Sequence, residues 1–212
     1  MNVQQRARSI GLTGNIACGK SSVASRLASH GAVVIDADVV ARELMLPRLP
    51  AWLDVVAAFG ADITGPGEAI DRAKLRSVVF SDAAALKRLN QAVHPHVHTE
   101  LVRRLDRLEP DQVAVIEAVA IVEAGTYRDL DALWLVVSPP ELQIQRLVQS
   151  RGLSREDAAW RVAGQPSVDD KLALADVVIR NDGSLDALND ATDRAWWTAL
   201  ATWQLPIRGD GT

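Results

Sequence analysis

The sequence predicts an α/β protein built on a parallel β-sheet. Short apolar runs alternate along the chain with segments in which apolar residues recur at helical spacing, which is the pattern of βαβ units. The run AVVI at residues 32–35 is apolar throughout, as expected of a strand that is buried on both faces. A glycine-rich loop, GNIACGKS at residues 14–21, lies between a strand-like run and a helical pattern. This order of strand, loop and helix is typical of the first unit of such a sheet.

The glycine-rich loop fits the phosphate-binding pattern G-x-x-x-x-G-K-[ST], whose fixed positions are here Gly14, Gly19, Lys20 and Ser21. The glycines let the chain wrap so that successive N–H groups face a phosphate, and a helix begins where the loop ends. Lys20 adds a positive charge near the β- and γ-phosphates, and the Ser21 hydroxyl suits Mg²⁺, which prefers oxygen ligands. The loop therefore predicts a nucleoside triphosphate site, against the alternative of a glycine-rich turn with an incidental lysine.

Two carboxylates, Asp36 and Asp38, follow the strand predicted over residues 32–35, and a helix is expected over residues 39–45. Ligands of open α/β folds bind at the carboxyl ends of the strands, so both residues are catalytic candidates. Alternatively, Asp38 only caps the next helix, because Asp is among the best N-cap residues. A capping box would require Glu or Gln at position 41, where this chain has Ala41.

Residues 46–110 predict a helical insertion, which is a natural place to bind an acceptor substrate. Around a turn-rich segment at 60–67, helical patterns cover residues 52–59, 72–80, 81–93 and 95–108. The histidines of HPHVH at residues 94–98 would share one face of a strand and suit a metal. Because Pro95 favours the start of a helix, we expect instead a structural or substrate-contacting role for His94.

The second half of the chain predicts three more strands and a helical hairpin. Strands are expected over residues 112–122, 132–137 and 175–179. A last helix is expected over residues 185–203. Its apolar stripe consists of Leu185, Leu188, Trp196, Leu200 and Trp203. The hairpin begins at Pro140, turns at Gly152 and stops near residues 164–166. Its arginines, Arg146, Arg151, Arg155 and Arg161, suit a lid that closes over phosphates, although nearby acidic residues nearly balance them. The tail IRGDGT, residues 207–212, is expected to be disordered.

Composition limits the classes of function. The chain has 212 residues and a net charge of −4, which argues against binding of nucleic acid. Cys18 is the only cysteine, so no disulfide forms within the chain, and a reducing compartment is expected. Since no apolar run approaches the length of a bilayer span, we expect no membrane association and a cytoplasmic protein.

The sequence resembles the dephospho-coenzyme A kinases, a family of P-loop kinases. The matching motifs stand in family order over residues 10–195: GLTGNIACGKSSVA, VIDADVVAREL, IDRAKL, HP at 94–95, IVEAG, QIQR, a glutamine at 165 and ADVVIRNDG. The resemblance implies a three-layer αβα fold with a parallel-sheet core, a helical acceptor-binding insertion and a helical lid. The implied segments are 1–45 for the nucleotide-binding core, 46–110 for the acceptor domain, 111–138 for core, 139–170 for the lid and 171–212 for core and C-terminal helix.

The same resemblance implies a reaction, in which ATP with Mg²⁺ phosphorylates the ribose 3′-hydroxyl of dephospho-coenzyme A. Another small-molecule kinase with this core, or a nucleotide-binding module without catalysis, is the alternative. The implied partner is a small molecule rather than nucleic acid or a membrane, and the protein is implied to be a monomer or weak homo-oligomer. The implied catalytic residues are Asp38, Lys20 and Arg146, and the implied metal ligands are Ser21 and Asp36. The implied ATP contacts are Gly14, Asn15, Ile16, Ala17, Cys18, Gly19, Lys20, Ser21, Ser22, Arg146, Arg151 and Asn181. The implied substrate contacts are Asp36, Asp38, Arg42, Arg72, His94 and Glu123.

The loop departs from the family pattern at Asn15 and Ala17, where glycines are usual, and at Cys18, where serine is usual. The family's Pro-Leu-Leu is replaced by residues 119–121, VAI. Asn15 and Ala17 must tolerate the backbone angles of the loop. Because Cys18 precedes a helix and lies close to Lys20 in sequence, we expect a stabilised thiolate that a thiol reagent would attack.

Overall fold

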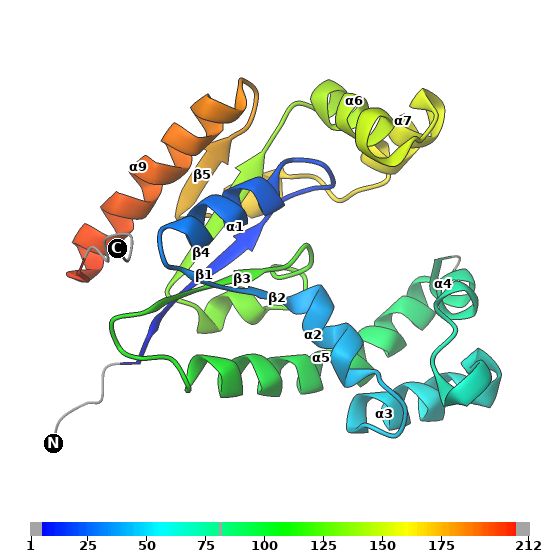
Figure 1. Cartoon of the computed structure of the whole chain (residues 1–212). Helices are drawn as coiled ribbons and strands as arrows, with labels where there is room; N and C mark the ends of the chain where they lie inside the picture. Colours follow the sequence, from blue (N-terminus) through cyan, green and yellow to red (C-terminus); the bar gives the residue numbers. More distant parts are fainter. Residues whose placement is uncertain (1–5, 81, 207–212) are drawn as a thin grey trace, which may run out of the picture. The chain divides into compact units, whose positions relative to one another are not determined.

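The structure is a computed structural model that describes residues 6–80 and 82–206 (Figure 1). The chain divides into two compact units, Met1–Ile35 with Leu108–Thr212, and Asp36–Arg107. Among the described residues, no helix is both long enough and apolar enough to cross a bilayer. The prediction of disorder for residues 207–212 falls on a segment that lies outside the described residues.

The first unit is organised around a five-stranded sheet of order β2-β3-β1-β4-β5. The strands are β1 (Arg8–Thr13), β2 (Val33–Asp36), β3 (Val113–Glu117), β4 (Ala132–Val137) and β5 (Val177–Arg180). β1 lies between β3 and β4 and is parallel to both, and β4 is parallel to β5. The predicted α/β class is confirmed, with the strand that leads into the phosphate loop at the centre of the sheet.

Two helices, α1 (Lys20–Ser29) and α9 (Leu185–Trp203), pack together against one face of this sheet (Figure 1). Alternate strand residues face them, as the period of two in a strand requires. The buried strand residues of this core are Ile10, Leu12, Val113, Val115, Trp134, Val136 and Ile179, and the helices contribute Val23, Ala24, Leu27, Leu188, Trp196 and Leu200. On the other face, a Cβ at Gly11 would meet the side chains of Ile121 and Leu130, so the connection between β3 and β4 lies directly on β1 there.

An ion-pair cluster also joins α1 to α9. Both oxygens of Asp193 accept from the Arg26 guanidinium, at 2.7 and 2.5 Å, and Asp193 Oδ1 lies 2.7 Å from His30 Nε2. The Arg26 hydrogen bonds are the main cause that lowers the pKa of Asp193 from 3.8 to about 2. The His30 ring in turn lies 4.7 Å from the Trp197 ring.

The expected helical hairpin is confirmed as α6 (Pro140–Arg151) and α7 (Arg155–Ala163), followed by α8 (Asp169–Leu172), which the sequence did not predict. Gly152 ends α6 with a φ of 63°. The Ser154 hydroxyl accepts from the Asp157 N–H at 3.0 Å, so the capping pattern begins α7 as predicted. A short 3₁₀ turn, η3 (Thr126–Asp129), lies in the connection between β3 and β4.

The second unit, Asp36–Arg107, is helical. It comprises α2 (Ala37–Leu44), α3 (Pro50–Phe59), two 3₁₀ turns, η1 (Ala61–Ile63) and η2 (Pro66–Glu68), α4 (Arg72–Phe80) and α5 (Ala83–Leu105). Its own small core consists of Val55, Ile63, Leu75 and Val93. The second unit therefore has a small hydrophobic core of its own.

The prediction of two helices over residues 81–93 and 95–108 was wrong, because α5 continues through Pro95. A proline in a helix loses one backbone hydrogen bond and costs about 3 kcal/mol. Residues on both sides of Pro95, Val93 and Leu101, are buried on this helix, and their burial offsets that cost.

Two further predictions were also wrong. The strand expected over residues 112–122 ends at Glu117, because the chain leaves the sheet after Ala118 and buries Ile121 from a loop, over Gly11. An apolar residue buried from a loop has the same sequence pattern as one in a strand. Leu185, placed on the apolar stripe of the last helix, is 61% exposed, because the first turn of α9 extends beyond the core.

Candidate active site

The phosphate loop runs from Gly14 to Gly19, between the end of β1 and the start of α1 at Lys20. Gly14 and Gly19 have φ angles of 149° and 102°, in the region that favours glycine. A Cβ at Gly14 would meet the carbonyl of Val136, and one at Gly19 would meet the side chain of Asn181. Each glycine is therefore required both by its backbone angle and by a close neighbour.

One of the two residues that replace the usual glycines of the loop carries a conformational cost. Ala17 has a φ of 55°, in the left-handed region, where a residue with a Cβ costs about 1–2 kcal/mol. Asn15 has no positive φ and instead makes a side-chain contact, since its Nδ2 donates to the Pro166 carbonyl at 3.4 Å. Asn15 thus joins the loop to the segment that follows α7.

Two donors that the motif provides for phosphate are engaged by oxygens of the chain itself. Lys20 Nζ donates to the carbonyl of Gly14 at 2.9 Å and to that of Asn15 at 3.4 Å. The Ile16 N–H donates to Gln165 Oε1 at 2.6 Å. These contacts place a cation and a backbone donor at the mouth of the loop, which is the arrangement that an anion requires.

Glu117, which was not among the predicted site residues, lies next to Ser21. The Ser21 hydroxyl donates to Glu117 Oε1 at 3.3 Å, and Glu117 is the last residue of β3, opposite Leu12 of β1. A hydroxyl and a carboxylate at this spacing form the oxygen set that a hard cation prefers. The signal that could have identified Glu117 is an acidic residue at the carboxyl end of a strand, but the predicted strand continued past it.

Cys18 does not have the environment that was expected of a reactive thiol. Its side chain is 1% exposed and belongs to the core beneath the loop. Burial raises the pKa of the Cys18 thiol, and this effect exceeds the opposing effects of the Lys20 charge and the Lys20 N–H. The prediction of a stabilised thiolate is therefore wrong, because the effect of desolvation on the thiol pKa outweighs that of the nearby positive charge.

Arg146 binds the back of the phosphate loop. Its guanidinium donates to the Ala17 carbonyl at 3.2 Å, to Ser138 Oγ at 3.0 Å and to the carbonyl and side-chain oxygens of Asn181 at 3.2 and 3.0 Å. Asn181 Nδ2 donates in turn to the Cys18 carbonyl at 2.8 Å. Since Ser138 follows β4 and Asn181 follows β5, this network ties the loop to the carboxyl ends of two strands.

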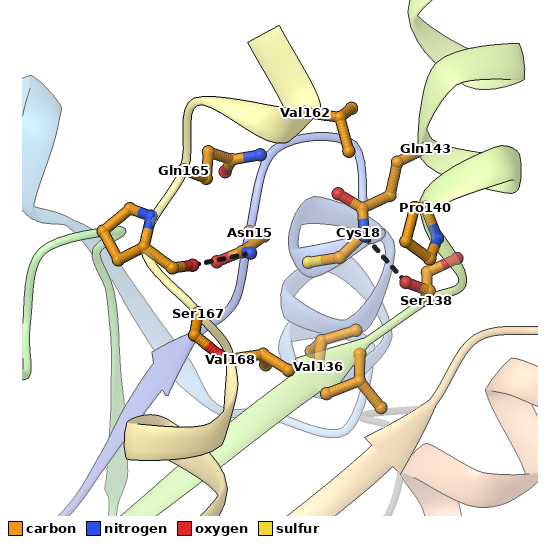
Figure 2. Close-up of a pocket in the computed structure, with 12 residues that line it drawn as sticks. Asn15, Cys18, Val136, Ser138, Pro140, Gln143, Val162, Gln165, Ser167 and Val168 are labelled. Carbon is orange, nitrogen blue, oxygen red and sulfur yellow. Dashed lines mark hydrogen bonds between the residues drawn. The ribbon is translucent and has the colours of Figure 1, made fainter. Parts of the chain in front are cut away.

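A cavity of about 240 Å³ lies beside the loop, with Asn15 and Cys18 in one wall (Figure 2). Two glutamines line it, and Figure 2 shows both amides directed toward the same space. Gln143 Nε2 donates to the Ser138 carbonyl at 2.7 Å, whereas Gln143 Oε1 and Gln165 Nε2 are buried without a hydrogen-bond partner among the described residues. The cavity thus holds one unpaired acceptor and one unpaired donor.

In the second unit, Asp36 rather than Asp38 caps the helix that follows β2. Asp36 Oδ1 accepts from the N–H groups of Asp38 and Val39, at 2.8 and 3.0 Å. The alternative in which Asp38 serves only as the cap is therefore wrong, since Asp38 lies in the first turn of α2 and is exposed. Arg42 Nε donates to the Asp38 carbonyl at 2.9 Å, one turn further along the helix.

The remaining predicted site residues lie in different places. Arg72 is an exposed residue at the start of α4, and Arg151 is an exposed residue at the end of α6. His94 is partly buried in α5, where desolvation lowers its pKa. Glu123 pairs at 3.2 Å with the ammonium of Lys171, which is only 2% exposed and also donates to the Val119 carbonyl at 3.1 Å. Sequence reasoning missed this buried lysine, because no motif marks it.

Comparison with known proteins identifies the family. The family model described as dephospho-CoA kinase matches residues 8–187. The dephospho-CoA kinase of Geobacter sulfurreducens is 42% identical over 189 residues, which cover 88% of this chain and 96% of that protein. The crystal structure of TT1252 from Thermus thermophilus superimposes with a TM-score of 0.77 at 34% identity, over 93% of this chain and 98% of that one.

A more distant neighbour shows the fold alone. The shikimate kinase of Acinetobacter baumannii has a TM-score of 0.55 at 18% identity and covers 93% of this chain and 96% of its own. The predicted P-loop kinase fold, with a parallel sheet flanked by helices, is confirmed. With the family model matched over most of the chain, the protein belongs to the dephospho-CoA kinase family.

Proposed function

We propose that this chain transfers the terminal phosphate of ATP to the ribose 3′-hydroxyl of dephospho-coenzyme A, the last step of coenzyme A synthesis. The observation that carries the proposal is the phosphate loop, with its glycine geometry, Lys20 and Ser21, in a chain that matches this kinase family over residues 8–187. Phosphoryl transfer requires mainly positioning and charge neutralisation, and the loop offers N–H groups and an ammonium for both.

Mg²⁺ is the metal that such a reaction uses. The residues present fit it, since Ser21 Oγ and Glu117 Oε1 lie 3.3 Å apart and both are oxygen ligands. When bound, the ion would neutralise charge on the β- and γ-phosphate oxygens. We assign Ser21 and Glu117 to it, and the predicted role of Asp36 stays a proposal, with one oxygen of Asp36 already accepting from the start of α2.

Asp38 is proposed to accept or orient the proton of the acceptor hydroxyl. Its position in the first turn of α2, directly after a strand of the sheet, supports this role because ligands of such folds bind where strands end. The loose transition state of phosphoryl transfer makes alignment of the hydroxyl more important than early removal of its proton. Arg42, Arg72, His94 and Glu123 stay proposed contacts of the acceptor.

The predicted roles of Arg146, Arg151 and Asn181 in binding the nucleotide stay proposals. Arg146 and Asn181 hold the carbonyls of Ala17 and Cys18 from behind the loop, so they keep its N–H groups oriented toward the phosphates. Arg151 is proposed to reach the nucleotide from the end of α6. We further propose a monomer or weak homo-oligomer that acts in the cytoplasm, in keeping with its one unpaired cysteine.

The proposed reaction is tested by measuring ADP release with Mg-ATP and a panel of acceptors: dephospho-coenzyme A, AMP, adenosine and several sugars. Turnover with dephospho-coenzyme A, and a product heavier by one phosphate on the ribose 3′-oxygen, is expected. Asp38→Asn should retain ATP binding and lose transfer. Turnover with another acceptor only would reject the substrate assignment, and normal turnover by Asp38→Asn would reject the role of that carboxylate.

A further inference from the structure

We propose that Gln165 is a ligand of the terminal phosphate of the bound nucleoside triphosphate, to which its Nε2 donates a hydrogen bond. The inference deepens the proposed function and depends on its premise that the loop binds ATP. Gln165 lies just beyond α7, separated from it by Gly164, so it belongs to the trailing end of the predicted lid. It is a side chain that neither the phosphate-loop motif nor the predicted site includes.

The orientation of the Gln165 amide follows from its partner. The Ile16 N–H can only donate, so the atom that faces it at 2.6 Å must be Oε1. The Nε2 end therefore points the other way, and Figure 2 shows it directed into the cavity beside the loop. That Nε2 is buried and has no hydrogen-bond partner among the described residues. A buried donor of this kind is costly unless a ligand supplies an acceptor.

The neighbouring loop indicates which acceptor this is. In the phosphate-loop motif, the backbone N–H groups of the loop cradle the α- and β-phosphates, and the lysine reaches the β- and γ-phosphates. Ile16 lies in the leading half of the loop, ahead of Gly19 and of the first turn of α1. Lys20 Nζ lies at this leading half, 2.9 Å from the Gly14 carbonyl oxygen and 3.4 Å from that of Asn15, so the terminal phosphate that it reaches is assigned there. The ionised oxygens of that phosphate accept hydrogen bonds and pair with a donor such as Gln165 Nε2.

The opposite wall of the cavity limits where the phosphate can lie. Gln143 is 6% exposed, and its unpaired Oε1 is an acceptor that would repel a phosphate oxygen placed against it. The phosphate is therefore assigned to the Gln165 side, and a water molecule or hydroxyl can donate to Gln143. The Asn15 contact with the Pro166 carbonyl, at 3.4 Å, holds the segment after Gln165 at the same loop.

Two other roles for Gln165 make different predictions. If Gln165 only occupies the Ile16 N–H in place of a phosphate, its removal frees that donor and tightens the binding of nucleotides. If its Nε2 only binds a water in the cavity, its removal leaves nucleotide binding unchanged. Of the three roles, only a contact with the terminal phosphate predicts that removal of Gln165 weakens ATP binding and changes ADP binding little.

The test is isothermal titration of ATP and ADP, each with Mg²⁺ and without any acceptor, on the whole chain. Gln165→Leu removes both amide groups at similar size and should weaken ATP binding about tenfold while ADP changes less than about twofold. Gln165→Glu places a carboxylate against the phosphate and should weaken ATP binding by about a hundredfold. The matched control is Gln149→Glu, which adds the same charge at an exposed position of α6.

The outcomes separate this inference from the proposed reaction. Equal losses for ATP and ADP, a gain for both, or no change in either would overturn the role of Gln165, and melting curves show whether each variant is folded. Because no acceptor is present, a chain that fails to phosphorylate dephospho-coenzyme A but shows the selective loss of ATP binding would reject the substrate and retain Gln165. A wild-type chain that binds no ATP would reject both.

Discussion

Gly19→Ala should destabilise the protein far more than Gly31→Ala, although both glycines have a positive φ. The angles are 102° at Gly19 and 90° at Gly31. A Cβ at Gly31 would meet nothing within 4 Å, whereas a Cβ at Gly19 would come closer than 3.0 Å to Asn181 Nδ2. Gly31→Ala therefore measures backbone strain alone, and Gly19→Ala adds a steric clash.

The expected magnitudes follow from these two terms. Backbone strain costs about 1–2 kcal/mol, and the lower flexibility of alanine in the unfolded chain returns about 0.4–1 kcal/mol, which leaves ~1 kcal/mol for Gly31→Ala. At Gly19 the clash adds about 1–3 kcal/mol, for a total of ~3 kcal/mol. Asn181 cannot simply move aside, because its Nδ2 donates to the Cys18 carbonyl at 2.8 Å and its Oδ1 accepts from Arg146 at 3.0 Å.

The measurement is thermal unfolding of both variants and of a double mutant. At this chain length 1 kcal/mol shifts Tm by about 2–4 °C, so Gly31→Ala should lose ~3 °C and Gly19→Ala ~9 °C. Asn181→Ala removes the clashing amide, so its cost and that of Gly19→Ala should not add in the double mutant. Equal losses for the two glycines, or strict additivity in the double mutant, would refute the steric explanation.

Three other perturbations test the remaining features. Glu117→Gln should weaken Mn²⁺ binding in the presence of nucleotide about tenfold, measured by electron paramagnetic resonance, and leave metal-free nucleotide binding unchanged; equal Mn²⁺ affinity would remove Glu117 from the metal site. The thiol of Cys18 should react with methyl methanethiosulfonate much more slowly in the folded chain than in urea, because it is buried and its pKa is raised; equal rates would contradict that burial. The pKa of Asp193 is lower in the folded chain than in the unfolded chain. Its ion pair therefore adds about 1 kcal/mol, after allowance for solvent screening, to the free energy of unfolding. This stabilisation is complete above the pKa of the unfolded chain and is lost as the pH falls through the pKa of the folded chain. The loss of unfolding free energy in Asp193→Asn should therefore be larger at pH 6 than at pH 2.5, and a difference independent of pH would count against this ion pair.

Much of the candidate site was predictable, because the phosphate loop is a contiguous motif whose glycines, lysine and serine carry the chemistry within a few residues. Glu117 and Gln165 were not recognised as site residues. Glu117 meets Ser21 only because β3 lies beside β1 in the sheet, and Gln165 meets Ile16 only because the chain returns from α7 to the loop. Neither pairing leaves a local pattern, since each joins residues far apart in sequence.

The same physical distinction applies to the fold. Local preferences were enough to indicate the α/β class, the positions of most helices and the capped start of α7, because capping and periodicity act over one or two turns. Packing decided that α5 runs through Pro95, that β3 ends at Glu117 and that the pKa of the Cys18 thiol is raised. In each of these three cases burial against distant residues outweighed the local signal, since the free energy of burial depends on the neighbours that surround a residue and not on its sequence alone.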